Sequence, residues 1–273
     1  MAFLKANINS QYLGGNTHIN FILPDKAWGQ DAAEFYSSGA RYKVLWLLHG
    51  GMGDYSDWVR KSDIELYATE KNLIVVMPSA LNSSYANIGG YNMYDFLVKE
   101  LMPFVYNWLP ASDKREDNYI AGLSMGGGGT LKYVLGFPEK FAGAAVLSAA
   151  ASDPREMFRG KAEGPMAEYA ERMKKEALEK YGSEEGYLAS EENLWDRLKE
   201  KSQSGLLPKF YCACGTKDFG IDGFRKFEEY AKSFGLEAKF EEIEGYAHEW
   251  RFWDLTIQHA LEYWGVPDNT VTV

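Results

Sequence analysis

Residues 118–129 read Asn-Tyr-Ile-Ala-Gly-Leu-Ser-Met-Gly-Gly-Gly-Gly, and this stretch decides the fold. Its first half is a short apolar run, which is typical of a strand buried on both faces. The centre, residues 122–126, has the pattern Gly-x-Ser-x-Gly, in which a nucleophilic serine occupies a sharp, strained turn between a strand and a helix. Glycines at the flanking positions Gly122 and Gly126 leave room where side chains would collide. We therefore predict a strand over 118–123, a turn at Ser124 and a helix over 127–136.

Short apolar runs and helical patterns alternate along the rest of the chain. The sequence predicts further strands over 17–23, 42–48, 73–77, 143–147, 209–214 and 240–243, and helices over 64–71, 95–108, 224–234 and 253–264. Alternation of this kind indicates an α/β fold with a mainly parallel sheet. The strands that come before the first helix are expected to pair antiparallel at one edge of that sheet.

Residues 152–205 differ from the rest, because 13 acidic and 10 basic side chains make 23 of these 54 residues charged. Pro165 is a suitable first residue for a helix that Gly182 would end, and Ser190 is a candidate cap for a second helix. We predict a helical cap insertion within a single domain that spans residues 1–273. Its two interpretations, structural padding and a cover over a site, are left open by the sequence.

Composition and charge exclude several classes of protein. The chain carries 29 Lys and Arg against 39 Asp and Glu, a net charge of −10, which argues against a nucleic-acid partner. Cys212 and Cys214 are too few for a zinc site and are expected to be free, buried thiols. No leader peptide and no long apolar span is recognisable, so we expect a cytoplasmic protein without a membrane partner.

A serine nucleophile needs a base, and the chain has four histidines. His18 lies too early in the chain, His49 directly precedes two glycines, and His259 falls inside a predicted helix. His248 follows the last predicted strand, in the loop Gly-Tyr-Ala-His-Glu-Trp, where a base that follows the serine and the acid along the chain would stand. We predict that His248 is the general base.

The base in turn needs a carboxylate that fixes its tautomer and stabilises its charged form. Asp218 follows the end of the predicted strand 209–214, and strand ends are where catalytic groups are delivered in parallel sheets. Asp222, four residues further on, is the competing candidate. The sequence favours Asp218.

A tetrahedral oxyanion requires preorganised N–H donors. The residue after the nucleophile, Met125, supplies one of them by the usual geometry of this turn. The second is expected from the loop His-Gly-Gly-Met-Gly at residues 49–53, where glycines permit close approach of the backbone. We assign it to the Gly51 N–H, with Met52 as the alternate.

Three longer motifs resemble a known family. They are Leu-Leu-His-Gly-Gly at 47–51, Ala-Gly-Leu-Ser-Met-Gly-Gly at 121–127 and His-Glu-Trp-Arg-Phe-Trp-Asp at 248–254. With the N-terminal residues, they make the chain resemble the bacterial tributyrin esterases. These are α/β-hydrolases related to esterase D, which is S-formylglutathione hydrolase, and to feruloyl and acetylxylan esterases.

The resemblance implies an eight-stranded α/β-hydrolase fold with a mostly parallel sheet flanked by helices. It implies that Ser124, Asp218 and His248 form a catalytic triad, that Gly51 and Met125 supply the oxyanion hole, and that a serine carboxylesterase hydrolyses short-chain acyl esters. It also implies that neither a cofactor nor a metal takes part.

The substrate pocket is predicted less sharply. Residues beside the predicted catalytic loops are expected to contact a small-molecule ester; they are Gly50, Met52, Trp58, Tyr85, Phe219 and Trp250. A feruloyl or acetylxylan esterase is the alternative, since Tyr85, Tyr91, Tyr94 and Trp250 are candidates to line an aromatic acyl site. An acyltransferase and a non-catalytic binding module are more distant alternatives, and association into a homo-oligomer stays open.

Overall fold

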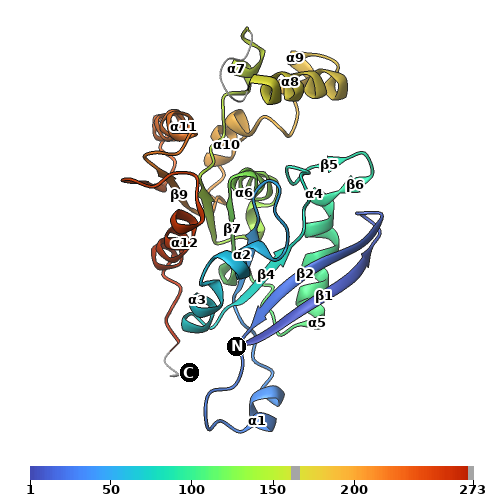
Figure 1. Cartoon of the computed structure of the whole chain (residues 1–273), viewed down its shortest axis with the longest axis vertical. Coiled ribbons are helices and arrows are strands. Elements are labelled where there is room, and N and C mark those ends of the chain that lie inside the picture. The colour runs from blue at the N-terminus through green and yellow to red at the C-terminus, as the bar shows by residue number, and fades with distance from the viewer. Residues whose placement is uncertain (161–166, 270–273) are drawn as a thin grey trace.

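The computed structural model describes residues 1–160 and 167–269, and an eight-stranded sheet runs through their centre (Figure 1). The strand order is β1-β2-β4-β3-β7-β8-β9-β10. The strands are β1 (Ala2–Ser10), β2 (Gly15–Leu23), β3 (Val44–Leu48), β4 (Ile74–Pro78), β7 (Asn118–Leu123), β8 (Gly143–Leu147), β9 (Lys209–Gly215) and β10 (Ala238–Ile243).

The strands from β4 to β10 pair in parallel, whereas β2 is antiparallel to both of its neighbours, β1 and β4. This confirms the predicted mainly parallel sheet with an antiparallel edge. A separate two-stranded hairpin consists of β5 (Asn87–Ile88) and β6 (Tyr91–Asn92). Because β3, β4, β7 and β8 are parallel neighbours, their carboxyl ends meet along one edge, and the loops that follow them lie side by side.

Both faces of the sheet are covered, which explains why its central strands are continuous apolar runs. In β3, Val44, Trp46 and Leu48 belong to one hydrophobic core and Leu45 and Leu47 to the other. The first core includes residues from α4 (Met93–Phe96), the π-helical turn Leu97–Leu101, α5 (Met102–Trp108), α6 (Met125–Gly136), α10 (Leu194–Ser202) and α11 (Ile221–Ser233). The second includes residues from α2 (Asp57–Lys61), α3 (Ile64–Glu70) and α12 (Trp250–Trp264).

The predicted helices occur, with shifted bounds. The predicted helix 95–108 is divided by its π-helical turn, and α6 begins two residues earlier than expected, at Met125. The short elements that were not predicted include α1 (Ala32–Ser37), which buries none of its residues, and α2. A helix without a buried face has no apolar periodicity by which to recognise it. Short 3₁₀ turns occur at Arg115–Asp117 and Pro138–Lys140.

The segment 152–205 connects β8 to β9. It forms α7 (Pro154–Phe158), α8 (Ala167–Tyr181), α9 (Glu184–Leu188) and then α10. Gly182, with φ 78°, follows the end of α8 as expected, whereas the predicted start at Pro165 lies outside the described residues. The expected cap at Ser190 is wrong. Asn193 caps α10 by accepting the Asp196 N–H at 3.1 Å, and the Ser190 hydroxyl instead donates to the carbonyl of Tyr187, at the end of α9.

In Figure 1, α7, α8 and α9 stand apart from the sheet as a separate lobe, whereas α10 lies closer to the body, where it packs on α6. The guanidinium of Arg155 bridges Asp153 at 3.1 Å and Asp196 at 2.5 Å, and so joins the start of α7 to α10. Cys212 and Cys214 are buried free thiols in β9, as predicted. Within residues 1–160 and 167–269, no helix has the length and apolarity to span a membrane.

Candidate active site

Ser124 stands between β7 and α6 in a backbone conformation that L-residues rarely adopt, with φ 52° and ψ −118°. The glycines around it are required by contacts. A Cβ on Gly122 would lie 2.2 Å from the carbonyl oxygen of Gly126, and a Cβ on Gly126 would lie 2.6 Å from that of His49. The elbow is therefore held against the end of β3 with no space for side chains at these two glycines, and Ser124 itself remains partly exposed.

The structure brings Ser124, His248 and Asp218 together from three separate loops. His248 Nε2 lies 3.0 Å from Ser124 Oγ, and His248 Nδ1 lies 2.8 Å from Asp218 Oδ2. Because a carboxylate accepts only, Nδ1 carries the proton and Nε2 is free to accept the hydroxyl proton of the serine. Trp253 packs edge-on against the imidazole, with 5.0 Å between the ring centroids.

Asp218 is 3% exposed and held by several donors. Burial alone would raise the pKa of this carboxyl, but hydrogen bonds from His248, from the Gly220 N–H at 2.8 Å and from Ser148 outweigh it, so its pKa lies below the ordinary value. Asp218 therefore stays ionised and able to stabilise an imidazolium. The competing candidate, Asp222, lies in the first turn of α11 with its side chain 91% exposed, and pairs with Arg225 instead.

His49 is buried behind the site and has a fixed tautomer. Its Nδ1–H donates to the carbonyl of Gly50 at 2.7 Å, and its Nε2 accepts the Ala80 N–H at 2.8 Å. Burial lowers the pKa of His49, so the ring stays neutral. The hydroxyl of Tyr85 also donates to the His49 carbonyl, at 3.0 Å. Through His49, the loop after β3 is fastened to the loop after β4.

Two backbone N–H groups, one in α6 and one in the loop after β3, are the predicted oxyanion donors. Met125 is the first residue of α6, so its N–H has no acceptor within the helix. Of the two candidates in the other loop, the Met52 N–H already donates to Asn82 Oδ1 at 2.7 Å. This favours Gly51 over Met52 as the second donor.

The residues predicted to contact substrate lie in different surroundings. Phe219 is 75% exposed and its ring lies 4.6 Å from that of His248, while Met52 is 94% exposed. Trp250 is partly buried against Trp58. Trp58 itself is buried and donates to the carbonyl of Leu48 at 3.0 Å, so it supports the site from within the core.

Tyr85, the remaining aromatic candidate, is fully buried against Gly129, where it too supports the site from behind. Gly50 is buried against Leu123 and Ser124, and a Cβ there would lie 2.5 Å from the Leu123 side chain. Of the expected contact residues, only Met52, Phe219 and the partly buried Trp250 keep exposed side-chain surface beside the site.

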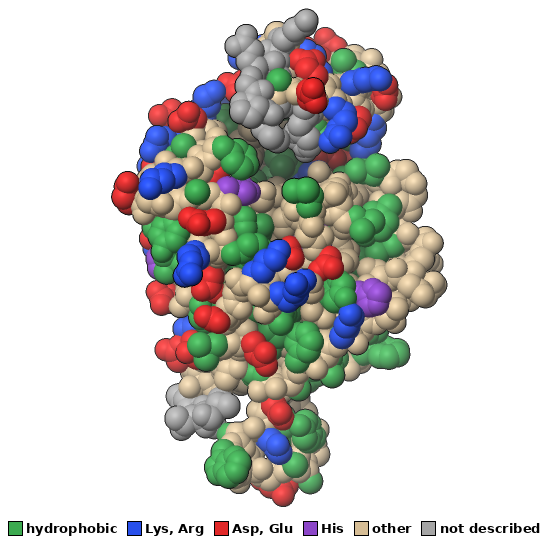
Figure 2. Space-filling view, in the orientation of Figure 1, with side chains coloured by type: hydrophobic (Ala, Val, Ile, Leu, Met, Phe, Trp, Pro, Cys, Tyr) green, Lys and Arg blue, Asp and Glu red, His purple; other side chains and the backbone are tan. Residues whose placement is uncertain are grey.

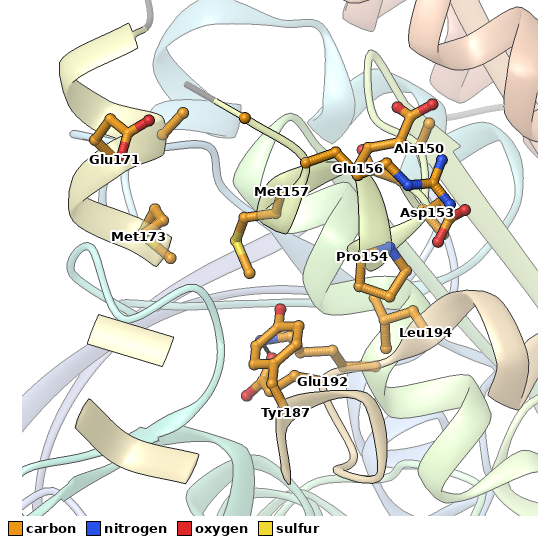
Figure 3. A pocket seen from close by; sticks show the side chains of 16 residues that line it. Ala150, Asp153, Pro154, Glu156, Met157, Glu171, Met173, Tyr187, Glu192 and Leu194 are labelled. Carbon is orange, nitrogen blue, oxygen red and sulfur yellow. Dashed lines mark ion pairs between the residues drawn. The ribbon is translucent and has the colours of Figure 1, made fainter. Parts of the chain in front are cut away.

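A cavity of about 540 Å³ lies between the lobe and the body (Figure 3). Its lining begins at Ala150 and Ala151, just after the β8 end that contributes Ser148, and Lys132 of α6 closes another side. Figure 3 shows Met157 and Tyr187 extending toward the open space from different parts of the lobe. In Figure 2 the recess between the top lobe and the body has hydrophobic side chains at its floor.

Sequence reasoning missed Asn82 and Ser148, which contact candidate catalytic groups through side chains. Neither belongs to a recognisable motif, and each meets its partner across at least 30 residues of chain. Within the described part of the chain, no group of three or more His, Cys, Asp or Glu side chains is placed to hold a metal ion.

The fold and this Ser-His-Asp arrangement define a serine hydrolase of the α/β-hydrolase class. The model of the Esterase family, described as putative esterases, matches residues 10–264, and the chain belongs to that family. An acetyl esterase of Caldicellulosiruptor saccharolyticus is 32% identical over 96% of this chain and 98% of its own.

Two solved structures from Staphylococcus aureus are also similar. The fluorophosphonate-binding serine hydrolase FphF is 29% identical with a TM-score of 0.79, covering 98% of this chain and 99% of its own. The S-formylglutathione hydrolase FrmB is likewise 29% identical with a TM-score of 0.79, over 97% and 99% of the two chains. These findings confirm the predicted resemblance, the α/β-hydrolase fold and the class of carboxylic ester hydrolase.

Proposed function

We propose that this chain hydrolyses short-chain carboxylic esters through an acyl-serine intermediate. The observation that carries the proposal is the continuous hydrogen-bonded relay from Ser124 through His248 to the buried Asp218. Ser124 is the nucleophile, His248 the general base and then acid, and Asp218 the group that orients the imidazole. The similarity to an acetyl esterase supports a short acyl group.

In the first half-reaction, His248 Nε2 takes the proton of Ser124 as Oγ attacks the ester carbonyl. The oxyanion that forms is stabilised by the N–H groups of Met125 and Gly51. The imidazolium then gives its proton to the departing alcohol, leaving acyl-Ser124. In the second half-reaction, a water gives its proton to His248 and attacks the acyl carbon. The bond between that carbon and Ser124 Oγ then breaks, His248 returns the proton to Oγ, and the acid is released.

The lobe of segment 152–205 is proposed to act as a cap that borders the bound ester. Its cavity starts at residues Ala150 and Ala151, directly after the strand end beside the elbow, where Ala149 contacts the position of Gly127. The feruloyl alternative receives less support, because Tyr85 is fully buried and the ring of Tyr94 is stacked on Tyr133.

The test combines turnover with covalent labelling. Wild-type protein is expected to hydrolyse p-nitrophenyl acetate and to be labelled by a fluorophosphonate probe. Ser124→Ala should lose both, with turnover falling by about 10⁴ to 10⁶, whereas Asp218→Asn should lose about 10⁴ in kcat. Asp222→Asn is the matched control and should match wild type. Labelling of Ser124→Ala, or an equal loss in both aspartate variants, would overturn these assignments.

The cellular location, the full range of binding partners and the oligomeric state remain predictions. A cytoplasmic location and a small-molecule ester as the only substrate class are proposed here, and homo-oligomer formation is left to a measurement of solution mass. A hydrolysis profile over acyl chain lengths and alcohol types would define the natural class of ester.

A further inference from the structure

The loop 50–53 beside the serine is a tight turn under strain. The Gly53 N–H donates to the carbonyl of Gly50 at 3.3 Å, and Met52, the third residue of the turn, has φ 60°. This position in a type II turn normally takes glycine or asparagine, because other side chains rarely adopt positive φ. Rotation of the peptide between Gly51 and Met52 would give a type I turn, in which methionine is unstrained. The side chain of Met52 is 94% exposed and offers no packing to prevent that rotation.

The N–H of that same peptide is the group that Asn82 holds. Asn82 Oδ1 accepts the Met52 N–H at 2.7 Å and is the heavy atom nearest to a Cβ placed on Gly51, at 3.9 Å. If the peptide rotated, the Met52 N–H would turn away from Asn82 Oδ1 and the hydrogen bond observed between them would be broken. This hydrogen bond to Asn82 therefore favours the strained form of the turn.

The loop that carries Asn82 is held in place by buried neighbours and by hydrogen bonds to His49. Asn82 is exposed, but the next residue, Ser83, is buried, as is Tyr85, whose hydroxyl is bonded to the His49 carbonyl. Ala80, on the other side, donates to His49 Nε2. These contacts connect the loop after β4 to His49, whereas the hydrogen bond of Asn82 connects the same loop to Met52 in the Gly50–Gly53 turn.

We infer that Asn82 is a positioning residue for the oxyanion hole: its side-chain carbonyl holds the strained Gly50–Gly53 turn so that the Gly51 N–H is aimed at the tetrahedral oxyanion. The inference rests on the proposed function, because it assumes that Gly51 is the second donor. Asn82 touches neither the substrate nor Ser124 in this role. It stabilises the transition state by keeping a neighbouring donor in place.

The test is a double-mutant cycle on the full chain, with Asn82→Ala, Met52→Gly and the two combined. Met52→Gly removes the strain that favours rotation, so the turn no longer depends on Asn82. The readouts are kcat/KM for p-nitrophenyl acetate, Ki for a trifluoromethyl ketone, which forms a tetrahedral adduct with an oxyanion, and the Tm. Asn107→Ala is the matched control, since Asn107 is an exposed asparagine on α5 with one side-chain bond, to the Pro103 carbonyl at 2.7 Å.

Asn82→Ala is expected to lower kcat/KM and weaken the ketone roughly 10- to 100-fold, less than deletion of a whole donor. In the Met52→Gly background the same substitution should change both by less than about threefold, a difference that double-mutant cycles resolve. Asn82→Ser, too short to reach the Met52 N–H, should match Asn82→Ala and serves in its place if that variant fails to fold. Asn107→Ala should match wild type.

Two results would overturn the inference. The first is an Asn82→Ala variant within threefold of wild type, and the second is an equal loss in both Met52 backgrounds. Both are distinguishable from failure of the proposed function, in which the wild-type protein itself hydrolyses no ester.

Discussion

Gly126 is the position where one added methyl group tests the geometry of the candidate site most directly. In Gly126→Ala the new Cβ would lie 2.6 Å from the His49 carbonyl oxygen and 2.7 Å from that of Leu48. Ordinary contact begins at 3.4 Å, so the elbow and the end of β3 must separate by about 0.8 Å. The His49 carbonyl resists this movement, because it is bonded to the buried Tyr85 hydroxyl.

The same separation acts on the oxyanion hole, whose two proposed donors stand on opposite sides of that contact. Donors act at 2.7–3.1 Å from the oxyanion, and an extra displacement of about 0.8 Å takes one of them out of range. We expect kcat to fall by about 10²- to 10³-fold, the loss that follows removal of one donor. Overpacking should also cost about 1–3 kcal/mol of stability.

Gly128 provides a control in the same helix. Apart from its chain neighbours and the adjacent backbone of its own helix, no atom of the described residues lies within 4 Å of a Cβ placed there. Gly128→Ala should therefore keep wild-type kcat and raise stability by up to ~1 kcal/mol, since alanine is the better helix former. The assay is kcat on p-nitrophenyl acetate, together with urea unfolding. A Gly126→Ala variant within threefold of wild-type kcat, or an equal loss in Gly128→Ala, would refute the reasoning.

Two further predictions concern stability. Lys132 of α6 pairs with Glu192 of segment 152–205 at 2.7 Å, with side chains only 13% and 17% exposed. In Lys132→Met, Glu192 keeps only the longer contact with Lys180 at 4.0 Å, so docking of the lobe should weaken by about 1–3 kcal/mol. Lys132→Met combined with Glu192→Leu should recover most of this loss. The measurement is hydrogen exchange over 167–205, and unchanged protection in Lys132→Met would contradict the prediction. Burial holds the pKa of His49 below its ordinary 6.5, so as the pH falls the unfolded chain binds a proton at His49 before the native chain does. The native state therefore loses stability as the pH falls below 6.5. Wild type should lose more stability than His49→Gln between about pH 6.5 and 5.5, by up to about 1 kcal/mol, as measured by urea unfolding. Equal losses of stability in the two proteins over this pH range would show that His49 does not titrate in this way.

The sheet was accessible from the sequence because its strands are buried on both faces. The bounds predicted for β7 and β8 are those observed, and the other predicted strands differ by a few residues. Edge strand β1, with most of its residues exposed or only partly buried, has no such run. The short helices α7 and α9 were missed for the same physical reason as α1, since little of their surface is fully buried.

The site was accessible only in part. Chain order and strand ends indicate Ser124, His248 and Asp218, and the structure brings these three within hydrogen-bonding distance. The choice between Gly51 and Met52 as oxyanion donor depends on the hydrogen bond between Met52 and Asn82, which are 30 residues apart in the chain. No local sequence pattern predicts that contact. Trp58 and Tyr85 were expected at the substrate because they follow catalytic loops, but adjacency along the chain does not say toward which side a ring points. Both rings face the core.

The way in which segment 152–205 joins the body would allow the lobe to be replaced by another without changing the sheet. Between two parallel strands, topology demands only one crossover element, and α10, packed on α6, already supplies it. The segment that contains α7, α8 and α9 lies between Asp153 and Asp196 along the chain. Arg155 pairs with both of these carboxylates and so holds the two ends of the segment together. A different lobe grafted between these two residues would inherit the same elbow, base and acid. The proposed cap and the catalytic groups therefore occupy separate pieces of chain, which are joined through Arg155 and through side-chain pairs such as Lys132 with Glu192 and Lys226 with Glu156.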